Sequence, residues 1–388
     1  MAAEGRRPLV AIDARGYFTG GGVGRYARNL LREVVSAASR QVDLRLLISN
    51  RHIPAELELP RAPGVEVIVS RADWMDGAKE RRWLDREVAD ADLVHVLSGH
   101  WVATHVPSIV TLHDLTPLVR PRLVGAEARQ TARRVVAALV RASRVIAVSE
   151  TTAQDARRVL GWQIPPIAVV HHAAAPAFRP GVECDGVLWR YGVAADEFTL
   201  AVSALNPHKN LAQLVAAYAA SAVTRPLLIA GAHREAAAEV HDAVVRHGLM
   251  GRVRLVGRVS DEDLAALYAG CRTFVFPSLY EGFGLPPLEA MACGAAVIAA
   301  HAGSIPEVVG DAAVLVDPFS TASLAAALRR VDADAALRKD LRRRSVAHAA
   351  TFSWARAATA TLAIYGATIR ACGPRGAARD GMEQGRAA

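Results

Sequence analysis

The sequence predicts an α/β protein built from two doubly wound domains, and three observations support this. Short apolar runs alternate with helical segments in both halves of the chain. The chain has 388 residues, of which 52% are hydrophobic, and this is enough for two packed cores. An irregular, proline-bounded segment separates the two series of strand–helix units. Repeated units of this kind favour parallel sheets with helices on both faces.

The first domain is expected over residues 1–171, followed by a linker over 172–196. Period-2 and continuous apolar runs predict its strands at 9–12, 44–48, 65–69, 93–97, 109–112 and 145–148. Amphipathic spacing predicts helices over 24–36 and 127–144.

The second domain is expected over residues 197–353. Its predicted strands are 198–202, 227–230, 253–256, 273–276, 297–300 and 313–316. Its predicted helices are 211–220, 235–247 and 261–270, with another opened by Pro286-Pro287. A final helix is expected over 354–371, and the small, polar residues 373–388 predict a disordered tail.

Charge and cysteine usage narrow the class of protein. Residues 1–172 contain 24 Lys and Arg against 18 Asp and Glu, so this half could face an anionic partner. Five arginines lie on one face of the predicted helix 127–144: Arg129, Arg133, Arg134, Arg141 and Arg144. This face predicts contact with an anionic membrane or a phosphate-bearing acceptor rather than with nucleic acid. The four isolated cysteines favour a reducing compartment. With neither a signal peptide nor a long apolar run, we expect a cytoplasmic protein, peripheral on the inner membrane face.

Two glutamates, Glu281 and Glu289, are the most informative feature of the chain. The strand predicted at 273–276 ends at Pro277, and Gly282 and Gly284 follow in the loop. This pattern predicts Glu281 in a loop at the carboxyl end of a strand and Glu289 in the first turn of the next helix. Ligands of open α/β sheets bind at such ends, although Glu289 could also simply cap its helix.

Three further motifs are predicted at carboxyl ends of strands. His113-Asp114 follows the strand 109–112, and Asp114 could orient the imidazole or cap the turn. His208-Lys209-Asn210 precedes a helix, where a lysine suits a phosphate. The glycine run 20–24 matches a dinucleotide fingerprint only superficially, because residues 13–19 separate it from the strand. A nucleotide-binding oxidoreductase is therefore a weak alternative.

The motif Glu281-x7-Glu289, with Gly-Phe-Gly-Leu-Pro between the two acids, resembles that of family-four retaining glycosyltransferases (group 1). The glycine run and His113-Asp-Leu-Thr-Pro117 also resemble that family. The resemblance covers about residues 8–370 and implies the B-type (GT-B) fold, in which two Rossmann-like domains face each other across a cleft. The final helix would then cross back to the first domain.

The resemblance also implies roles for individual residues. Glu281 and His113 would be catalytic and lie beside the donor sugar. Glu289 would hold the ribose of the nucleotide, because a carboxylate accepts from both hydroxyls of a cis-diol. The other donor-binding residues would be Gly21, Gly22, His208, Lys209, Val259, Asp261, Phe283, Gly284 and Leu285. The family often has Arg-Lys where His208-Lys209 stands, so we expect donor affinity to depend on Lys209 and backbone amides. The safer role for Ser260 and Asp263 is a capping box.

The predicted activity is transfer of a sugar from a nucleotide-diphosphate sugar, by resemblance GDP-mannose, to a hydroxyl of a glycan or glycolipid acceptor. The anomeric configuration would be retained, and no metal or other cofactor would be needed. A metal-dependent enzyme would need an Asp-x-Asp pair after a strand. The sequence has three Asp-x-Asp triplets, at 90–92, 261–263 and 332–334, and we interpret all of them as surface carboxylates. A sugar-nucleotide epimerase of the same fold and a non-catalytic nucleotide-sugar binding protein are the alternatives.

Overall fold

The computed structural model describes residues 6–38, 41–49, 59–70, 77–98 and 105–373. The chain divides into two compact units. Unit 1 consists of residues 1–118, 126–171 and 354–388, and unit 2 consists of residues 119–125 and 172–353. The tail predicted at 373–388 lies outside the described residues except for Gly373.

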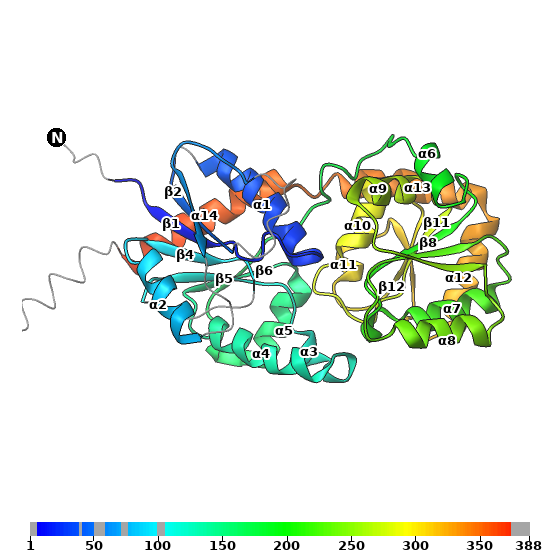
Figure 1. The fold of residues 1–388 in the computed structure, drawn as a ribbon, viewed down its shortest axis with the longest axis horizontal. Coiled ribbons are helices and arrows are strands. Elements are labelled where there is room, and N and C mark those ends of the chain that lie inside the picture. Colours follow the sequence, from blue (N-terminus) through cyan, green and yellow to red (C-terminus); the bar gives the residue numbers. More distant parts are fainter. Residues whose placement is uncertain (1–5, 39–40, 50–58, 71–76, 99–104, 374–388) are drawn as a thin grey trace, which may run out of the picture. The chain divides into compact units, whose positions relative to one another are not determined.

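Unit 1 is built on a seven-stranded parallel sheet with the order β3-β2-β1-β4-β5-β6-β7 (Figure 1). β1 pairs on one side with β2, with Leu9 opposite Asp43, and on the other with β4, with Val10 opposite Leu93. The strand order therefore reverses at β1, as in doubly wound folds. The strands are β1 Leu9–Asp13, β2 Asp43–Ser49, β3 Val65–Ser70, β4 Leu93–Val96, β5 Ser108–Leu112, β6 Arg144–Ala147 and β7 Ile167–Val169.

Helices cover this sheet, and the last helix of the chain belongs to unit 1. They are α1 Gly22–Ala38, α2 Gly77–Glu87, α3 Thr116–Val119, α4 Ala126–Leu139, α5 Glu150–Leu160 and α14 Trp354–Cys372. α14 packs against α1 and β4, so the return of the final helix to the first domain is confirmed. The helix predicted over 127–144 ends earlier, at Leu139, because Arg144 already begins β6 and pairs with Ile109 of β5.

Unit 2 has a six-stranded parallel sheet with the order β10-β9-β8-β11-β12-β13. Its strands are β8 Thr199–Val202, β9 Leu227–Ala230, β10 Val253–Gly257, β11 Thr273–Phe276, β12 Val297–Ala300 and β13 Ala313–Val316. Its helices are α6 Asp185–Arg190, α7 Leu211–Ser221, α8 Ala237–Arg246, α9 Asp261–Gly270, α10 Leu285–Ala292, α11 Ile305–Val309, α12 Thr321–Ala333 and α13 Ala335–Ala349. The segment 172–196, expected to be a linker, belongs to this unit and contains α6.

The core of unit 2 explains why these helices form where they do. α7 buries Leu214, Val215 and Tyr218, which recur at helical spacing and face the sheet. Burying a side chain of this size contributes about 1.5–3 kcal/mol. The strands β11 and β12 are buried at every position, and this accounts for their continuous apolar sequences.

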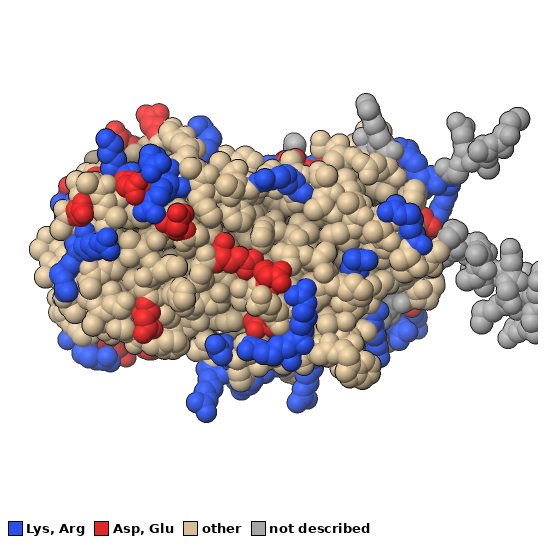
Figure 2. All heavy atoms as spheres, turned by 180° about the vertical axis from the view of Figure 1, so that it is seen from behind, with Lys and Arg blue, Asp and Glu red and all other residues tan. Residues whose placement is uncertain are grey.

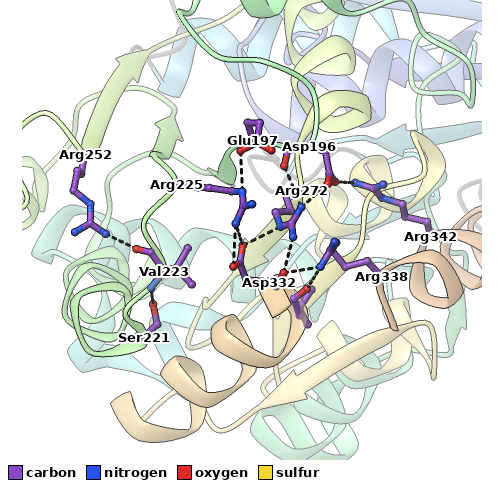
Figure 3. Close-up of polar contacts among 11 residues, drawn as sticks. Asp196, Glu197, Ser221, Val223, Arg225, Arg252, Arg272, Asp332, Arg338 and Arg342 are labelled. Carbon is purple, nitrogen blue, oxygen red and sulfur yellow. Dashed lines mark hydrogen bonds and ion pairs between the residues drawn. The ribbon is translucent and has the colours of Figure 1, made fainter. Parts of the chain in front are cut away.

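A group of ion pairs ties together the amino-terminal ends of the strands in unit 2 (Figure 3). Arg272, directly before β11, donates to Asp332 at 2.9 Å and to Asp196 at 2.5 Å. Arg225, two residues before β9, donates to both oxygens of Asp332, at 3.0 and 3.1 Å. We call this group the amino-edge network: Asp196, Glu197, Arg225, Arg272, Asp332, Arg338 and Arg342. The prediction that Asp332 is a simple surface carboxylate is therefore wrong, because it lies in the last turn of α12 and accepts from two arginines.

Candidate active site

The candidate site lies at the opposite, carboxyl-terminal edge of the unit 2 sheet. All strands of this sheet are parallel, so the loops that follow them leave at this edge, among them residues 203–210 after β8, 277–284 after β11, 301–304 after β12 and 317–320 after β13. β8 and β11 are neighbours in the sheet. The loops that contain His208-Lys209 and Glu281 therefore start side by side.

Lys209 and Glu281 form an ion pair between these two loops. The Lys209 ammonium donates to Glu281 Oε1 at 2.5 Å, and the two side chains are only 16% and 14% exposed. Burial by itself raises the pKa of the Glu281 carboxyl, but the charges of Lys209 and His208 and hydrogen bonds from Lys209 and Ser278 outweigh it. The pKa of Glu281 is consequently held below its ordinary value. The site thus presents an ionised carboxylate beside a cation.

The backbone around Lys209 is fixed by hydrogen bonds to the β11 loop. The carbonyl of His208 accepts from the Leu279 amide at 2.8 Å and from Ser278 Oγ at 3.1 Å. The backbone of Asn210 is in the left-handed region, with φ 60°. Its side-chain Nδ2 donates to the carbonyls of Pro277 and Pro318 at 3.2 and 2.8 Å. A left-handed residue is tolerated best as Gly or Asn. Asn210 therefore ends the turn that carries Lys209 and attaches it to two neighbouring loops.

The Glu281 loop is supported from below by the loop after β12. Ser304 Oγ donates to the carbonyls of Glu281 and Phe283, at 3.1 and 2.8 Å. A Cβ atom at Gly303 would lie 2.8 Å from the Glu281 carbonyl oxygen, and Gly303 has φ 55°. Only glycine fits this close approach without strain. Ser304, Gly303, Ser278 and Asn210 were not among the predicted site residues, although 303–304 follow a predicted strand at the same edge.

Residues 283–285 form the entrance to α10. Gly284 precedes the helix with φ 100°, and Pro286 and Pro287 occupy its next positions after Leu285. The two prolines have no amide hydrogen, so the first turn offers few donors. In the part of the chain that the structure describes, the Gly284 and Leu285 amides do not donate to another backbone group. These two amides remain suitable for an anion.

Glu289 differs from its predicted position. α10 begins at Leu285, so Glu289 is its fifth residue rather than part of its first turn. It is completely buried, and the Tyr268 hydroxyl lies 3.5 Å from its Oε2 atom. Burial, followed by the charge of Glu289, raises the pKa of Cys293 to about 12. A helix cap at the surface is thus excluded for Glu289, whereas a role toward a ribose stays a prediction.

The predicted base-binding residues Val259 and Asp261 lie at the start of α9 and are half-buried. Ser260 caps this helix by accepting from the Asp263 amide at 3.1 Å, so its predicted capping role is confirmed. Asp263 also accepts from Arg190 at 2.5 Å and from Tyr191 at 2.9 Å. It is therefore paired rather than a free surface carboxylate.

An open hollow of about 520 Å³ lies farther along the same edge, at the ends of β12 and β13. It is lined by His301, Leu315, Val316, Asp317, Pro318 and Phe319. None of the predicted site residues lines it. Pro318 connects it to the site, because its carbonyl accepts from Asn210.

In unit 1, the glycine run lies in the connection between β1 and α1. β1 ends at Asp13, and α1 begins at Gly22, so the glycines do not directly follow the strand. Gly21 has φ 84°, and there is open space where a Cβ would be. This geometry disfavours the dinucleotide fingerprint and leaves a loop whose amides can approach a ligand.

His113, at the end of β5, is held in one orientation. Its Nε2 lies 2.8 Å from the Leu97 carbonyl, and its ring meets the Tyr26 ring edge-on at 4.9 Å. Burial lowers its pKa, against the opposing effects of the Leu97 hydrogen bond and the Asp114 charge. The imidazole is thus neutral near pH 7, with Nε2 donating to Leu97. Asp114 accepts from the Thr116 amide at 2.8 Å, so it caps the turn into α3.

The predicted arginine face is smaller than expected. Arg129, Arg133 and Arg134 are exposed on α4, whereas Arg141 follows the helix and Arg144 is a partly buried residue of β6. Figure 2 shows the molecule from behind, with basic side chains projecting along its lower edge, where α3 and α4 lie. No helix among the described residues has the length and apolarity to cross a bilayer. In the same described part of the chain, no three His, Cys, Asp or Glu side chains gather as a metal site.

Comparison with known proteins identifies the family. Residues 193–347 match the family described as Glycosyl transferases group 1, and residues 20–177 match Glycosyltransferase Family 4. The chain is 32% identical to the O-antigen chain mannosyltransferase B of Escherichia coli over 266 residues, which covers 66% of this chain and 70% of that protein. The chain is a family-four glycosyltransferase. This membership favours a glycosyltransferase over an epimerase, an oxidoreductase or a non-catalytic binding protein.

Further relatives of this glycosyltransferase differ in length or in sequence. It is 32% identical to the serotype-specific mannosyltransferase WbdA of Escherichia coli over 302 residues, or 71% of this chain, but spans only 37% of WbdA. Sucrose-phosphate synthase of Thermosynechococcus elongatus superimposes with a TM-score of 0.78 at 25% identity, over 94% of this chain and all of that one. WaaG, a glycosyltransferase involved in lipopolysaccharide biosynthesis, superimposes with a TM-score of 0.70 at 17% identity, over 92% of this chain and 99% of that one. The two Rossmann-like units are thus those of the GT-B fold.

Proposed function

We propose that this glycosyltransferase transfers mannose from GDP-mannose to a hydroxyl of a glycan or lipid-linked glycan, with retention of the anomeric configuration. The ion pair of Lys209 and Glu281 is the observation that carries the proposal. The Gly284 and Leu285 amides follow Glu281 in the same loop, at the entrance to α10, where an anionic diphosphate would be stabilised. The names of the relatives, two of them mannosyltransferases, support mannose as the sugar.

In this proposal unit 2 binds the donor. Negative charge builds on the diphosphate as the glycosidic bond breaks, and Lys209 with the neighbouring amides would stabilise it by preorganised electrostatics. Glu281 would fix the ammonium of Lys209 and contact the donor sugar. Glu289 would hold the ribose, and Val259 and Asp261 would contact the base. No metal is required in this scheme, since Lys209 supplies the positive charge.

Unit 1 would bind the acceptor, with Gly21 and Gly22 approaching the diphosphate. His113 would contact the donor sugar as a neutral imidazole, because burial lowers its pKa. The exposed arginines of α4 would contact the phosphates of an anionic membrane or of a lipid-linked acceptor.

A donor screen tests the proposal. The purified protein is incubated with GDP-mannose, UDP-glucose or ADP-glucose and a mannose-terminated lipid-linked acceptor, with and without EDTA. We expect transfer from GDP-mannose in both conditions, and an α-linked product by NMR. Transfer from UDP-glucose alone would overturn the choice of donor, a β-linked product would overturn retention, and loss of transfer in EDTA would overturn metal independence.

A further inference from the structure

Unit 1 contains a continuous chain of buried polar groups that runs from α14 to α1. The Tyr365 hydroxyl lies 2.6 Å from His95 Nδ1, and His95 Nε2 lies 2.8 Å from Thr111 Oγ1. Thr111 Oγ1 in turn lies 3.0 Å from the Tyr26 hydroxyl. All four residues are at most 1% exposed. Four segments far apart in the sequence, α14, β4, β5 and α1, thus share one polar chain.

Each group in this chain depends on its neighbours. A buried polar group without a partner costs about 1–3 kcal/mol, and water does not reach these atoms to replace one. Burial, reinforced by the nearby His113, lowers the pKa of His95 to about 3. The neutral imidazole has one N–H and one acceptor nitrogen, so one neighbour accepts from it and the other donates to it. The chain therefore has a defined hydrogen-bond direction and fixed ring orientations.

The chain ends at Tyr26, whose ring packs against His113. The Tyr26 ring, held by its hydroxyl at Thr111, meets the His113 imidazole edge-on at an interplanar angle of 82°. The Tyr26 ring also packs against the ring of Trp354, the first residue of α14, with the ring centroids 6.0 Å apart. The partner of His113 Nε2 is the carbonyl of Leu97, the residue that follows β4, where His95 lies. The Leu97 hydrogen bond and the Tyr26 ring contact of His113 thus both rest on elements joined by the buried chain.

We propose that Tyr365, His95 and Thr111 are positioning residues that, through Tyr26, fix the orientation of the His113 imidazole. This inference deepens the proposed function, because it rests on His113 contacting the donor sugar. It also gives α14 a specific task. A hydroxyl in the second half of the last helix positions a side chain directly after β5, 252 positions earlier in the sequence. A misplacement of a positioned group by about 1 Å can cost on the order of 100-fold in rate.

Two readouts on four variants test the proposal. Tyr365→Phe removes the first hydroxyl of the chain, Thr111→Val interrupts it in the middle, and Thr111→Ser restores the hydroxyl there. Thr361→Val is the matched control, since Thr361 is a fully buried residue of α14 whose hydroxyl donates only to the Ala357 carbonyl of its own helix, at 2.7 Å. The ring resonance of His113 is followed by NMR in histidine-labelled protein, assigned by its loss in His113→Gln. Transfer kinetics are measured in parallel.

We expect Tyr365→Phe and Thr111→Val to shift the His113 resonance and to lower kcat on the order of tenfold, with little change in the donor KM. Thr111→Ser should return both toward the wild-type values, and Thr361→Val should leave both unchanged. If Tyr365→Phe and Thr111→Val match Thr361→Val in both readouts, the proposal is wrong. If either Tyr365→Phe or Thr111→Val does not fold, the other variant decides whether the proposal holds. If the wild type transfers no sugar, the proposed function fails, while the NMR result still decides whether the chain orients His113.

Discussion

The two edges of the unit 2 sheet both pair cations with carboxylates, but they do so differently. At the amino-terminal edge, three arginines pair with three acids, and backbone carbonyls accept from Arg272 and from a fourth arginine, Arg338 (Figure 3). At the carboxyl-terminal edge, a single lysine meets a single glutamate between two loops. The first arrangement uses many donors of each arginine within the protein. In the second arrangement, the bond to Glu281 uses one of the three ammonium hydrogens of Lys209, and the other two are left over.

This difference separates a stabilising role from a binding role. Arg272 alone donates to Asp196, Asp332 and the Asp332 carbonyl, which anchors β11 to α12 and to the start of β8. Lys209 and Glu281 instead lie in loops whose backbones are fixed by Asn210 and Ser304. Rigid loops with a nearly buried ion pair and adjacent unpaired amides are preorganised for a charged ligand. Substitutions at the two edges should therefore act on different properties.

The largest effect is expected for Glu281→Gln, which keeps the size of the side chain and removes its charge. Turnover should fall on the order of 1,000-fold, about 4 kcal/mol in the activation barrier, because the charge beside Lys209 and the sugar is lost. The measurement is kcat for transfer, with Glu239→Gln on the exposed face of α8 as control. A fall of less than tenfold would contradict the assignment of Glu281.

The second effect concerns stability. Arg272→Met should lower the free energy of unfolding by about 3 kcal/mol, since Asp332 and Asp196 would keep their charges in partly buried positions. kcat of the folded protein should stay within about twofold. Urea unfolding gives the free energy, and Arg343→Met removes an exposed ion pair as control, with an expected loss of less than about 1 kcal/mol. If Arg272→Met lost much of its kcat while its stability stayed normal, the assignment of stability to the amino-terminal edge and of binding to the carboxyl-terminal edge would be wrong.

The third prediction concerns the cation of the site. Lys209→Met should weaken GDP-mannose binding about 10- to 100-fold, because a hydrogen bond to a charged group contributes about 1.5–3 kcal/mol. Calorimetric titration measures this, with the exposed Lys339→Met as control. Unchanged affinity would remove Lys209 from the donor site.

The same variant has a signature in pH. The folded-state pKa of Glu281 lies below its ordinary value, so its contribution to stability is present above that ordinary value and is lost as pH falls through the folded-state pKa. Without Lys209, the largest effect that opposes burial is lost, so the pKa of Glu281 should rise. Urea unfolding at several pH values below about 5 should then show a smaller acid loss of stability in Lys209→Met than in the wild type.

The smallest effect is expected for a cation outside both edges. Arg133 is exposed on α4 of unit 1 and forms no ion pair with the described residues. Arg133→Gln should weaken binding to vesicles containing anionic phospholipid about fivefold, since an arginine near such a surface contributes about 1 kcal/mol. Co-sedimentation measures the binding, with zwitterionic vesicles and Arg246→Gln as controls. Equal binding of wild type and Arg133→Gln would remove this surface from the proposal.

Several features were predictable because local rules decide them. The strands β9, β11, β12 and β13 lie at the predicted residues, since each is a short apolar run between turn residues. The loop position of Glu281 followed from Pro277 and the glycines. The end of α4 was predicted too late, because residues 140–143 (Val-Arg-Ala-Ser) remain compatible with a helix, and only the pairing of Arg144 with β5 shows that a strand begins there.

The sequence by itself determined two doubly wound units, the edge at which each motif lies and the family. Its reasons are local: hydrophobic period, turn residues, and the spacing of Glu281 and Glu289. Only the tertiary structure decided which charges meet. The pairing of Lys209 with Glu281, the burial of Glu289, the capture of Asp332 by two arginines and the chain from Tyr365 to Tyr26 each join segments distant in sequence. Such contacts depend on sheet order and loop packing, which no local pattern encodes.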